Sequence, residues 1–316
     1  MAIQFLLLIL GFALLIKGAD WTVDGASAFA KKIHISDLAI GLTIVAFGTS
    51  APELVVNVFA SFQNHQNIVL GNVIGSNNFN LFVILGTAGL ITPLVVQSST
   101  VWKEIPYSFI AILFLYMQTN DLLSPDSRVL TRLDGLILLI MFSIFLFYVY
   151  KQLGSDKPES ETALKDYSML KIWSFIIFGL IGLMIGGKLV VTNAVQMTTT
   201  LGISEKIVGL TIVAAGTSLP EMATSVVAAL KKNSDIAVGN IIGSNIFNIF
   251  FVLAISSLIR PINYDTAFNS DLYLLAGGTV FLVTAMFTGK KKKLDRWEAG
   301  ILIVTYIVYT VYLINN

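Results

Sequence analysis

The stretch GLTIVAFGTSAPELVVNV at residues 41–58 returns almost unchanged as GLTIVAAGTSLPEMATSV at residues 209–226. Twelve of the eighteen aligned positions are identical, at an offset of 168 residues and without a gap. The same offset places GNVIGSNNFN (71–80) on GNIIGSNIFN (239–248), with eight of ten positions identical. Agreement at one fixed offset indicates an internal repeat, so the chain contains two copies of one unit.

The composition around these motifs is typical of a membrane protein. Hydrophobic residues make up 55% of the 316 residues and charged residues 12%, and the mean hydropathy is +0.80. A helix that crosses the hydrocarbon core needs about 20 mainly apolar residues. The sequence predicts ten such segments, at 3–29, 36–62, 68–92, 103–119, 131–151, 170–199, 204–231, 235–258, 271–288 and 297–314.

Each copy of the repeat contains five predicted spans. Because five is an odd number, the second copy enters the membrane from the opposite side, and the repeats are inverted. Pro52 and Pro220 each remove a backbone donor within the second and seventh spans, and we expect both helices to be broken there. The predicted fold is an all-α integral membrane protein, with repeats at 1–151 and 169–316 and a cytoplasmic linker at 152–168.

Basic residues predict the orientation. The connections on the side of the N-terminus carry four Lys or Arg residues, and those on the opposite side carry fourteen. Because basic loops are retained in the cytoplasm, we expect both termini outside the cytoplasm and the chain in the cell (plasma or inner) membrane. Lys17, Asp20 and Asp24 lie near the end of the first span, where we interpret them as interfacial residues.

Two carboxylates inside predicted spans point to function. Glu53 and Glu221 each follow the proline of a broken helix, and a charge there costs roughly 2–4 kcal/mol if nothing compensates it. The second, third, seventh and eighth spans contain no basic residue away from their ends. The natural partner is therefore a cation, and the alternative is a protonated pair that ties helices together.

The duplicated motifs surround these glutamates with oxygen atoms only. The polar residues in question are Thr49, Ser50, Ser76 and Asn80 in one copy, and Thr217, Ser218, Ser244 and Asn248 in the other. Carboxylates, hydroxyls, amide oxygens and free carbonyls suit Ca²⁺ better than Mg²⁺, which prefers strict octahedral geometry. The same oxygens can accept Na⁺. For any one hydroxyl or amide, the alternative is a hydrogen bond between helices.

The glycine pairs Gly71/Gly75 and Gly239/Gly243 have the spacing that lets membrane helices approach closely. We expect them to pack the third and eighth spans against the second and seventh.

Other chemistries find little support. The chain has no cysteine, and its histidines, His34 and His65, lie in short connections. We find no GxSxG, HExxH or GxxxxGK[ST] pattern, and we expect neither an enzyme nor a resident cofactor. A net charge of +1 gives no basic surface for nucleic acid, and no obligatory protein partner is evident.

The motifs GTSAPE (48–53) and GTSLPE (216–221), followed by GNVIGSNNFN and GNIIGSNIFN, resemble the two alpha-repeats of the sodium/calcium exchanger family within the cation/calcium antiporters. The resemblance covers the whole chain. It implies antiport of Ca²⁺ against Na⁺ by alternating access, with the first and sixth spans sliding across the other eight.

The resemblance also implies roles for single residues. Glu53 and Glu221 are then ligands shared between the ions, and the carbonyls of Thr49 and Thr217 complete the calcium site. The flanking sodium sites are then formed by Ser50, Ser76, Ser218 and Ser244 with the carbonyls of Ala46 and Ala214.

One position departs from some relatives. Potassium-dependent exchangers and certain prokaryotic members carry aspartate where this chain has Asn248. The asparagine argues against a potassium requirement and leaves the central site with a formal charge of −2. A Ca²⁺/H⁺ antiporter is the nearest alternative, because glutamates in a cavity can exchange protons; a cation channel is a more distant one.

Overall fold

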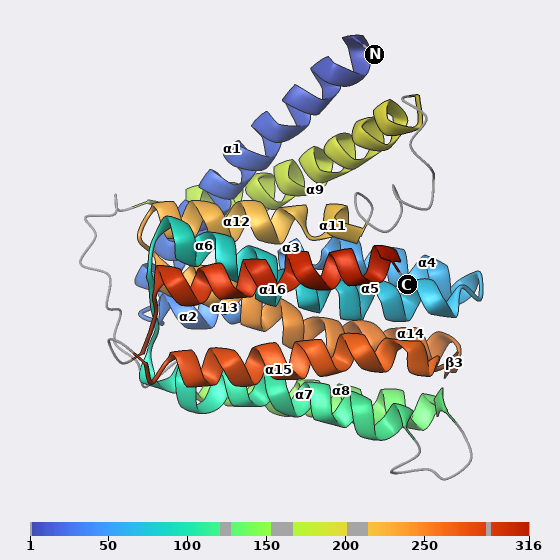
Figure 1. Cartoon of the computed structure of the whole chain (residues 1–316). Coiled ribbons are helices and arrows are strands. Elements are labelled where there is room, and N and C mark those ends of the chain that lie inside the picture. The colour runs from blue at the N-terminus through green and yellow to red at the C-terminus, as the bar shows by residue number, and fades with distance from the viewer. Residues whose placement is uncertain (1, 121–127, 153–166, 201–213, 289–291, 316) are drawn as a thin grey trace.

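The computed structural model describes residues 2–120, 128–152, 167–200, 214–288 and 292–315, and long helices dominate it (Figure 1). In the first half the elements are α1 (Ala2–Lys32), α2 (Asp37–Ile40), η1 (Gly41–Val45), α3 (Ala46–Thr49), α4 (Ala51–Phe62), α5 (Gln66–Asn78), η2 (Phe79–Ile84), α6 (Leu85–Ile91), β1 (Leu94–Val95), η3 (Thr100–Glu104), α7 (Ile105–Thr119), β2 (Val129–Leu130) and α8 (Arg132–Gln152).

The second half repeats this order. Its elements are α9 (Met169–Thr200), α11 (Ala214–Thr217), α12 (Leu219–Leu230), α13 (Ser234–Phe247), η5 (Asn248–Val252), α14 (Leu253–Ile259), β3 (Ile262–Asn263), η6 (Thr266–Phe268), α15 (Asn269–Ala285), β4 (Lys293–Leu294) and α16 (Arg296–Asn315). The segments η1, η2, η3 and η5 are π-helical turns within longer helices.

Several helices are long and apolar enough to cross a membrane. Among the described residues five helices meet both conditions, namely Ile3–Lys32, Gln66–Ile91, Arg132–Lys151, Met169–Asn193 and Ser234–Ile259. The pair Asp37–Thr49 and Ala51–Phe62 meets them together as one bent span. Residues 201–213 of the predicted seventh span and 153–166 of the predicted linker lie outside the described residues, so the division into repeats stays a prediction.

The predicted break in the second span is present. The axes of the two helical pieces differ by 46°, and Ser50 joins them with φ −83° and ψ 6°. Ser218 has the equivalent conformation between α11 and α12, with φ −89° and ψ 10°. In both copies the proline follows the break by two residues, in the first turn of the new helix, where its missing N–H costs least.

Helices α1 and α9 form a closely packed pair that diverges from the other helices in Figure 1. A Cβ atom added at Gly18 would lie 2.8 Å from the carbonyl oxygen of Gly179, and one added at Gly179 would lie 2.8 Å from that of Gly18. Gly11 and Gly186 meet in the same way, at 3.0 and 2.8 Å. Only glycine permits such an approach of two backbones, so the four glycines hold α1 and α9 together.

The predicted glycine contact of the eighth span is also present. A Cβ atom added at Gly243 would lie 2.8 Å from the Ala46 side chain and from the carbonyl oxygen of Leu42. This confirms that 235–258 packs against the second span. The equivalent contact of Gly75 falls on residues 210 and 214 by the repeat offset, and residue 210 is outside the described residues.

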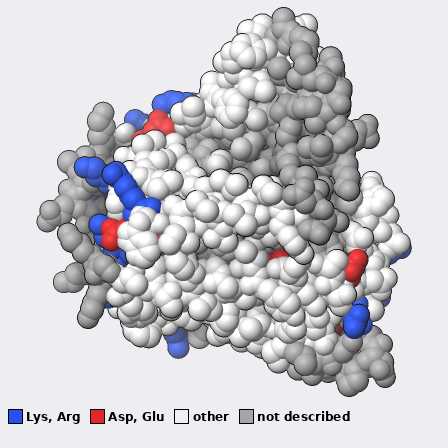
Figure 2. All heavy atoms as spheres, viewed as in Figure 1, with Lys and Arg blue, Asp and Glu red and all other residues white. Residues whose placement is uncertain are grey.

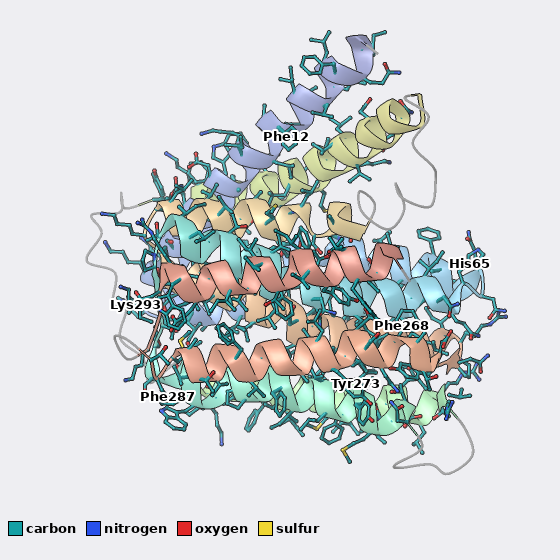
Figure 3. The ribbon with its side chains drawn as sticks, viewed as in Figure 1. Phe12, His65, Phe268, Tyr273, Phe287 and Lys293 are labelled. Carbon is teal, nitrogen blue, oxygen red and sulfur yellow. The ribbon has the colours of Figure 1, made fainter. Side chains whose placement is uncertain are left out.

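Two short antiparallel ribbons join the halves. Leu94 pairs with Leu294 in one ribbon, and Leu130 pairs with Ile262 in the other. Lys293, in the first ribbon, lies at one end of the helices, and Phe268, just after the second ribbon, lies at the other (Figure 3). Both chain termini point toward the end where Phe268 lies (Figure 1), and basic side chains gather on the visible face at the end of Lys293 (Figure 2).

Candidate functional site

Two buried carboxylates occupy the first turns of α4 and α12. Glu53 and Glu221 are both completely buried, as are Ser50 and Ser218 at the two helix breaks. None of the ion pairs formed by the described residues involves either glutamate. A buried carboxylate without a basic partner is costly, so these positions require another source of compensation.

The serine at each break donates a hydrogen bond to the glutamate of the other half. Ser50 Oγ donates to Glu221 Oε1 at 2.8 Å, and Ser218 Oγ donates to Glu53 Oε1 at 3.0 Å. Ser244 Oγ lies 3.0 Å from Ser50 Oγ. The second oxygen of each carboxylate, Oε2, is buried and has no hydrogen-bond partner. Each glutamate therefore has one oxygen held by the protein and one available to a ligand.

Two amide oxygens are available in the same way. Oδ1 of Asn80 and Oδ1 of Asn248 are buried without a hydrogen-bond partner. Asn80 lies in the π-helical turn η2, and Asn248 begins the turn η5. Such turns occur frequently at functional sites because they alter the direction of side chains relative to a regular helix. Ser76 lies beside Glu53, and Thr49 and Ser244 lie beside Glu221.

Backbone carbonyls at the first break are partly uncovered. Pro52 has no N–H to donate to the carbonyl of Gly48, and among the described residues no backbone N–H hydrogen bonds to the Thr49 carbonyl across the break. The Ala46 carbonyl accepts from Ser50 N at 3.0 Å and from Thr49 Oγ1 at 3.3 Å. Ala214 begins α11, directly after the residues that are not described.

The threonine hydroxyls point to asparagines of the opposite half. Thr49 Oγ1 donates to Asn240 Oδ1 at 3.0 Å, and Thr217 Oγ1 donates to Asn72 Oδ1 at 3.2 Å. This arrangement leaves the carbonyl of each threonine, rather than its hydroxyl hydrogen, as the group suited to a cation.

The unpartnered oxygens define what the site can bind. Two carboxylate and two amide oxygens, supplemented by hydroxyls and carbonyls, form an oxygen-only environment with a formal charge of −2 when both glutamates are ionised. Hard cations prefer such ligands. In the described part of the chain no group of three or more His, Cys, Asp or Glu side chains gathers, so neutral oxygens make up the rest of any coordination shell.

Comparison with known proteins agrees with this chemistry. A family model described as sodium/calcium exchanger protein matches residues 3–151 and 171–315. The chain belongs to the sodium/calcium exchanger family. As a member of that family it is a multi-pass membrane protein and a transporter of the cation/calcium antiporter type.

Three relatives illustrate the similarity. The sodium/calcium exchanger MaX1 of Methanosarcina acetivorans is 30% identical over 98% of this chain and 98% of its own length. The inner membrane protein YrbG of Escherichia coli is 33% identical over 94% of this chain and 92% of its own. A solved structure of the sodium-calcium exchanger NCX_Mj, soaked with 10 mM Na⁺ and zero Ca²⁺, superimposes with a TM-score of 0.85 at 31% identity and covers 98% of this chain and 99% of its own.

Sequence reasoning did not single out four asparagines of this exchanger that contact the site residues. Asn72 and Asn240 accept from the threonine hydroxyls, and Asn77 and Asn245 contact Asn248 and Asn80. All four are identical between the repeats at the 168-residue offset. The duplication therefore contained the signal that would have found them.

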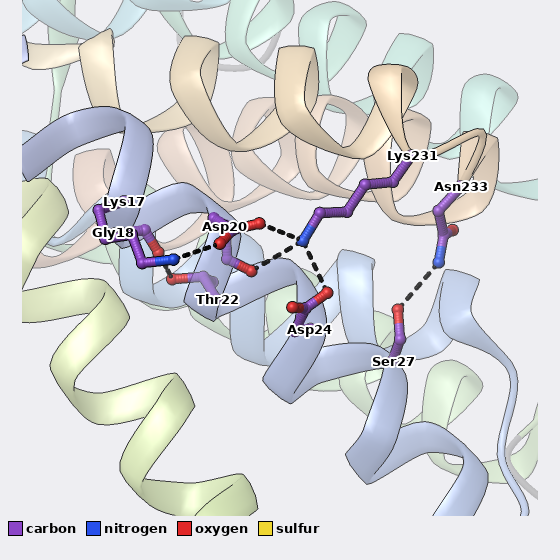
Figure 4. Close-up of polar contacts among 8 residues, drawn as sticks. All are labelled: Lys17, Gly18, Asp20, Thr22, Asp24, Ser27, Lys231 and Asn233. Atoms are coloured by element: carbon purple, nitrogen blue, oxygen red, sulfur yellow. Dashed lines mark hydrogen bonds and ion pairs between the residues drawn. The ribbon is translucent and has the colours of Figure 1, made fainter. Parts of the chain in front are cut away.

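A second polar cluster of the exchanger lies at the end of α1, far from the symmetry of the site (Figure 4). Lys231, which follows α12, contacts Asp20 and Asp24 of α1 at 2.6 Å each, and Lys17 contacts Asp20 at 2.8 Å. The Lys231 and aspartate side chains are about a third exposed. The residues that we interpreted as interfacial are thus also a link between α1 and α12.

Proposed function

We propose that this chain is a secondary active antiporter that exchanges Ca²⁺ for Na⁺ by alternating access around Glu53 and Glu221. The observation that carries the proposal is the pair of buried carboxylates, each with one oxygen bonded to the opposite half and one without a partner. Ca²⁺ compensates both charges at once and accepts an irregular set of oxygen ligands. Na⁺ competes for the same oxygens, and this competition is the physical basis of exchange.

The proposed ligands follow the two halves. The calcium site consists of the two glutamates with the Thr49 and Thr217 carbonyls and the Asn80 and Asn248 amide oxygens. The sodium sites add Ser50, Ser76, Ser218 and Ser244 with the Ala46 and Ala214 carbonyls. The name of MaX1 and the Na⁺ soak of NCX_Mj support this choice of ions for relatives of similar length.

The proposed topology is ten spans in two inverted repeats, 1–151 and 169–316, with both termini outside the cytoplasm. The strands support the inversion, because β1 and β3 are equivalent at the 168-residue offset and lie at opposite ends of the helices (Figure 1). Helices α1 and α9, joined by their glycines, are the elements proposed to slide across the rest. Their separation from the other helices at one end supports this role.

The test is uptake of radiolabelled Ca²⁺ into proteoliposomes that contain Na⁺, K⁺ or only buffered protons, with the membrane potential clamped. We expect uptake only when Na⁺ is inside, and saturation with external Ca²⁺. Protein-free vesicles provide the background. Uptake driven equally by a proton gradient moves the chain to the Ca²⁺/H⁺ alternative, and a Ca²⁺ conductance that needs no counter-ion identifies a channel.

A further inference from the structure

Four hydrogen bonds connect the two halves beside the proposed ligands Asn80 and Asn248. Asn80 Nδ2 donates to Asn245 Oδ1 at 3.0 Å, and Asn248 Nδ2 donates to Asn77 Oδ1 at 3.1 Å. Asn77 Nδ2 donates to the Asn245 carbonyl at 3.1 Å, and Asn245 Nδ2 donates to the Asn77 carbonyl at 3.4 Å. The repeat offset exchanges the members of each pair of bonds. All four side chains are buried.

The orientation of a side-chain amide decides whether it can bind a cation. An asparagine presents an acceptor oxygen on one side and an NH₂ donor on the other, and only the oxygen can coordinate a cation. At Asn80 and Asn248 the NH₂ group is used by the partner asparagine, and Oδ1 is left buried without a partner. The partner's own NH₂ is fixed by a carbonyl, so its Oδ1 always faces the site asparagine.

We propose that Asn77 and Asn245 are positioning residues that hold the amides of Asn248 and Asn80 with their oxygens toward the transported cation. The inference rests on the proposed function and adds residues that do not themselves touch the ion. Each positioning residue acts on the ligand of the opposite half, so the site is oriented only when both halves are packed together. Groups that orient a metal ligand typically alter affinity about 10- to 100-fold when they are removed.

The asparagine at position 248 makes this role testable. An aspartate there has two equivalent oxygens and no NH₂ group, so it presents an acceptor in either orientation. Asn77 is therefore needed when residue 248 is asparagine and becomes dispensable after Asn248→Asp. A residue with a merely structural role would be needed equally in both cases.

The experiment measures Ca²⁺ binding to the purified full-length chain by isothermal titration calorimetry, with the melting temperature as a check of folding. We compare Asn77→Leu in the native background with Asn77→Leu added to Asn248→Asp. We expect affinity to fall about 10- to 100-fold in the first case and less than about threefold in the second. The mirror pair, Asn245→Leu with and without Asn80→Asp, provides an independent replicate.

The outcomes separate this inference from the proposed function. An equal loss of affinity in both backgrounds overturns the inference while the wild-type chain still binds and exchanges Ca²⁺. A wild-type chain that binds neither Ca²⁺ nor Na⁺ overturns the proposed function and the inference with it. If the leucine variants do not fold, Asn77→Asp keeps the acceptor for Asn248 and removes only the donor; a loss of affinity above about tenfold then contradicts the inference.

Discussion

The two repeats make matching contacts at the centre of the molecule and different contacts at the end of α1. At the centre, Ser50 bonds to Glu221 as Ser218 bonds to Glu53, although the residues of each pair are 171 and 165 positions apart. At the end of α1, Lys231 binds Asp20 and Asp24, whereas the repeat offset replaces these residues by Gln63, Lys188 and Thr192.

The difference separates contacts that a shared site requires from contacts that serve one end of the molecule. A cation between two halves needs equivalent ligands from both, so the contacts that orient those ligands are duplicated. The ion pairs of Lys231 have no such requirement. They connect α1 to α12 at one end only, and we expect them to influence stability without altering the chemistry of the site.

The largest expected effect comes from the glutamates. Glu53→Gln and Glu221→Gln each remove half of the site's charge, and we expect each to lower Na⁺-driven Ca²⁺ uptake about 100-fold. Glu298→Gln is the matched control, because Glu298 is fully buried but accepts from Asp295 N at the start of α16, a bond that glutamine also makes. Effects that differ by more than about tenfold between the two site variants would show that the halves are unequal.

The next effect concerns the glycines between α1 and α9. Gly18→Ala and its counterpart Gly179→Ala place a methyl group against a backbone carbonyl, which costs about 1–3 kcal/mol. We expect both to lower the melting temperature of the purified protein by similar amounts. Gly277→Ala is the control, since nothing lies within 4 Å of its added Cβ. An unchanged melting temperature for Gly18→Ala would contradict the close packing of α1 and α9.

The serine bonds should sharpen the comparison at the site. Ser50→Ala and Ser218→Ala each remove one donor to a buried carboxylate, and we expect the apparent Ca²⁺ affinity to fall about tenfold in each case. Ser61→Ala provides the control, because Ser61 is buried but donates within its own helix to the Asn57 carbonyl. Calcium titrations of uptake measure all three variants, and a normal affinity in either site variant would remove that serine from the site.

The smallest expected effect belongs to the unmatched cluster. Lys231→Gln gives the second repeat the residue that the first repeat has at Gln63, and we expect it to lower stability by less than about 1 kcal/mol. The difference in melting temperature from the wild type should shrink in 1 M salt, because partly exposed ion pairs are screened. A loss of Ca²⁺ affinity as large as that of the serine variants would place the cluster in the transport site after all.

Much of the fold was predictable from the chain alone because membrane helices depend on local composition. The predicted segments 3–29, 131–151 and 170–199 correspond within a few residues to α1, α8 and α9, since a helix in lipid must satisfy its own backbone groups. The break before Pro52 was predictable for the same local reason. The π-helical turns at Phe79–Ile84 and Asn248–Val252 were not, because no local pattern distinguishes them from regular helix.

For the candidate site, the sequence by itself determined which residue types were present and that each occurs twice at one offset. It also placed Glu53 and Glu221 within apolar segments, where a charge demands a partner. Only the tertiary structure decided which side chains meet: that Ser50 bonds to Glu221 rather than Glu53, that Asn77 orients Asn248, and that Lys231 binds Asp20. These contacts join residues more than 160 positions apart, and they depend on how whole helices pack, which local composition does not specify.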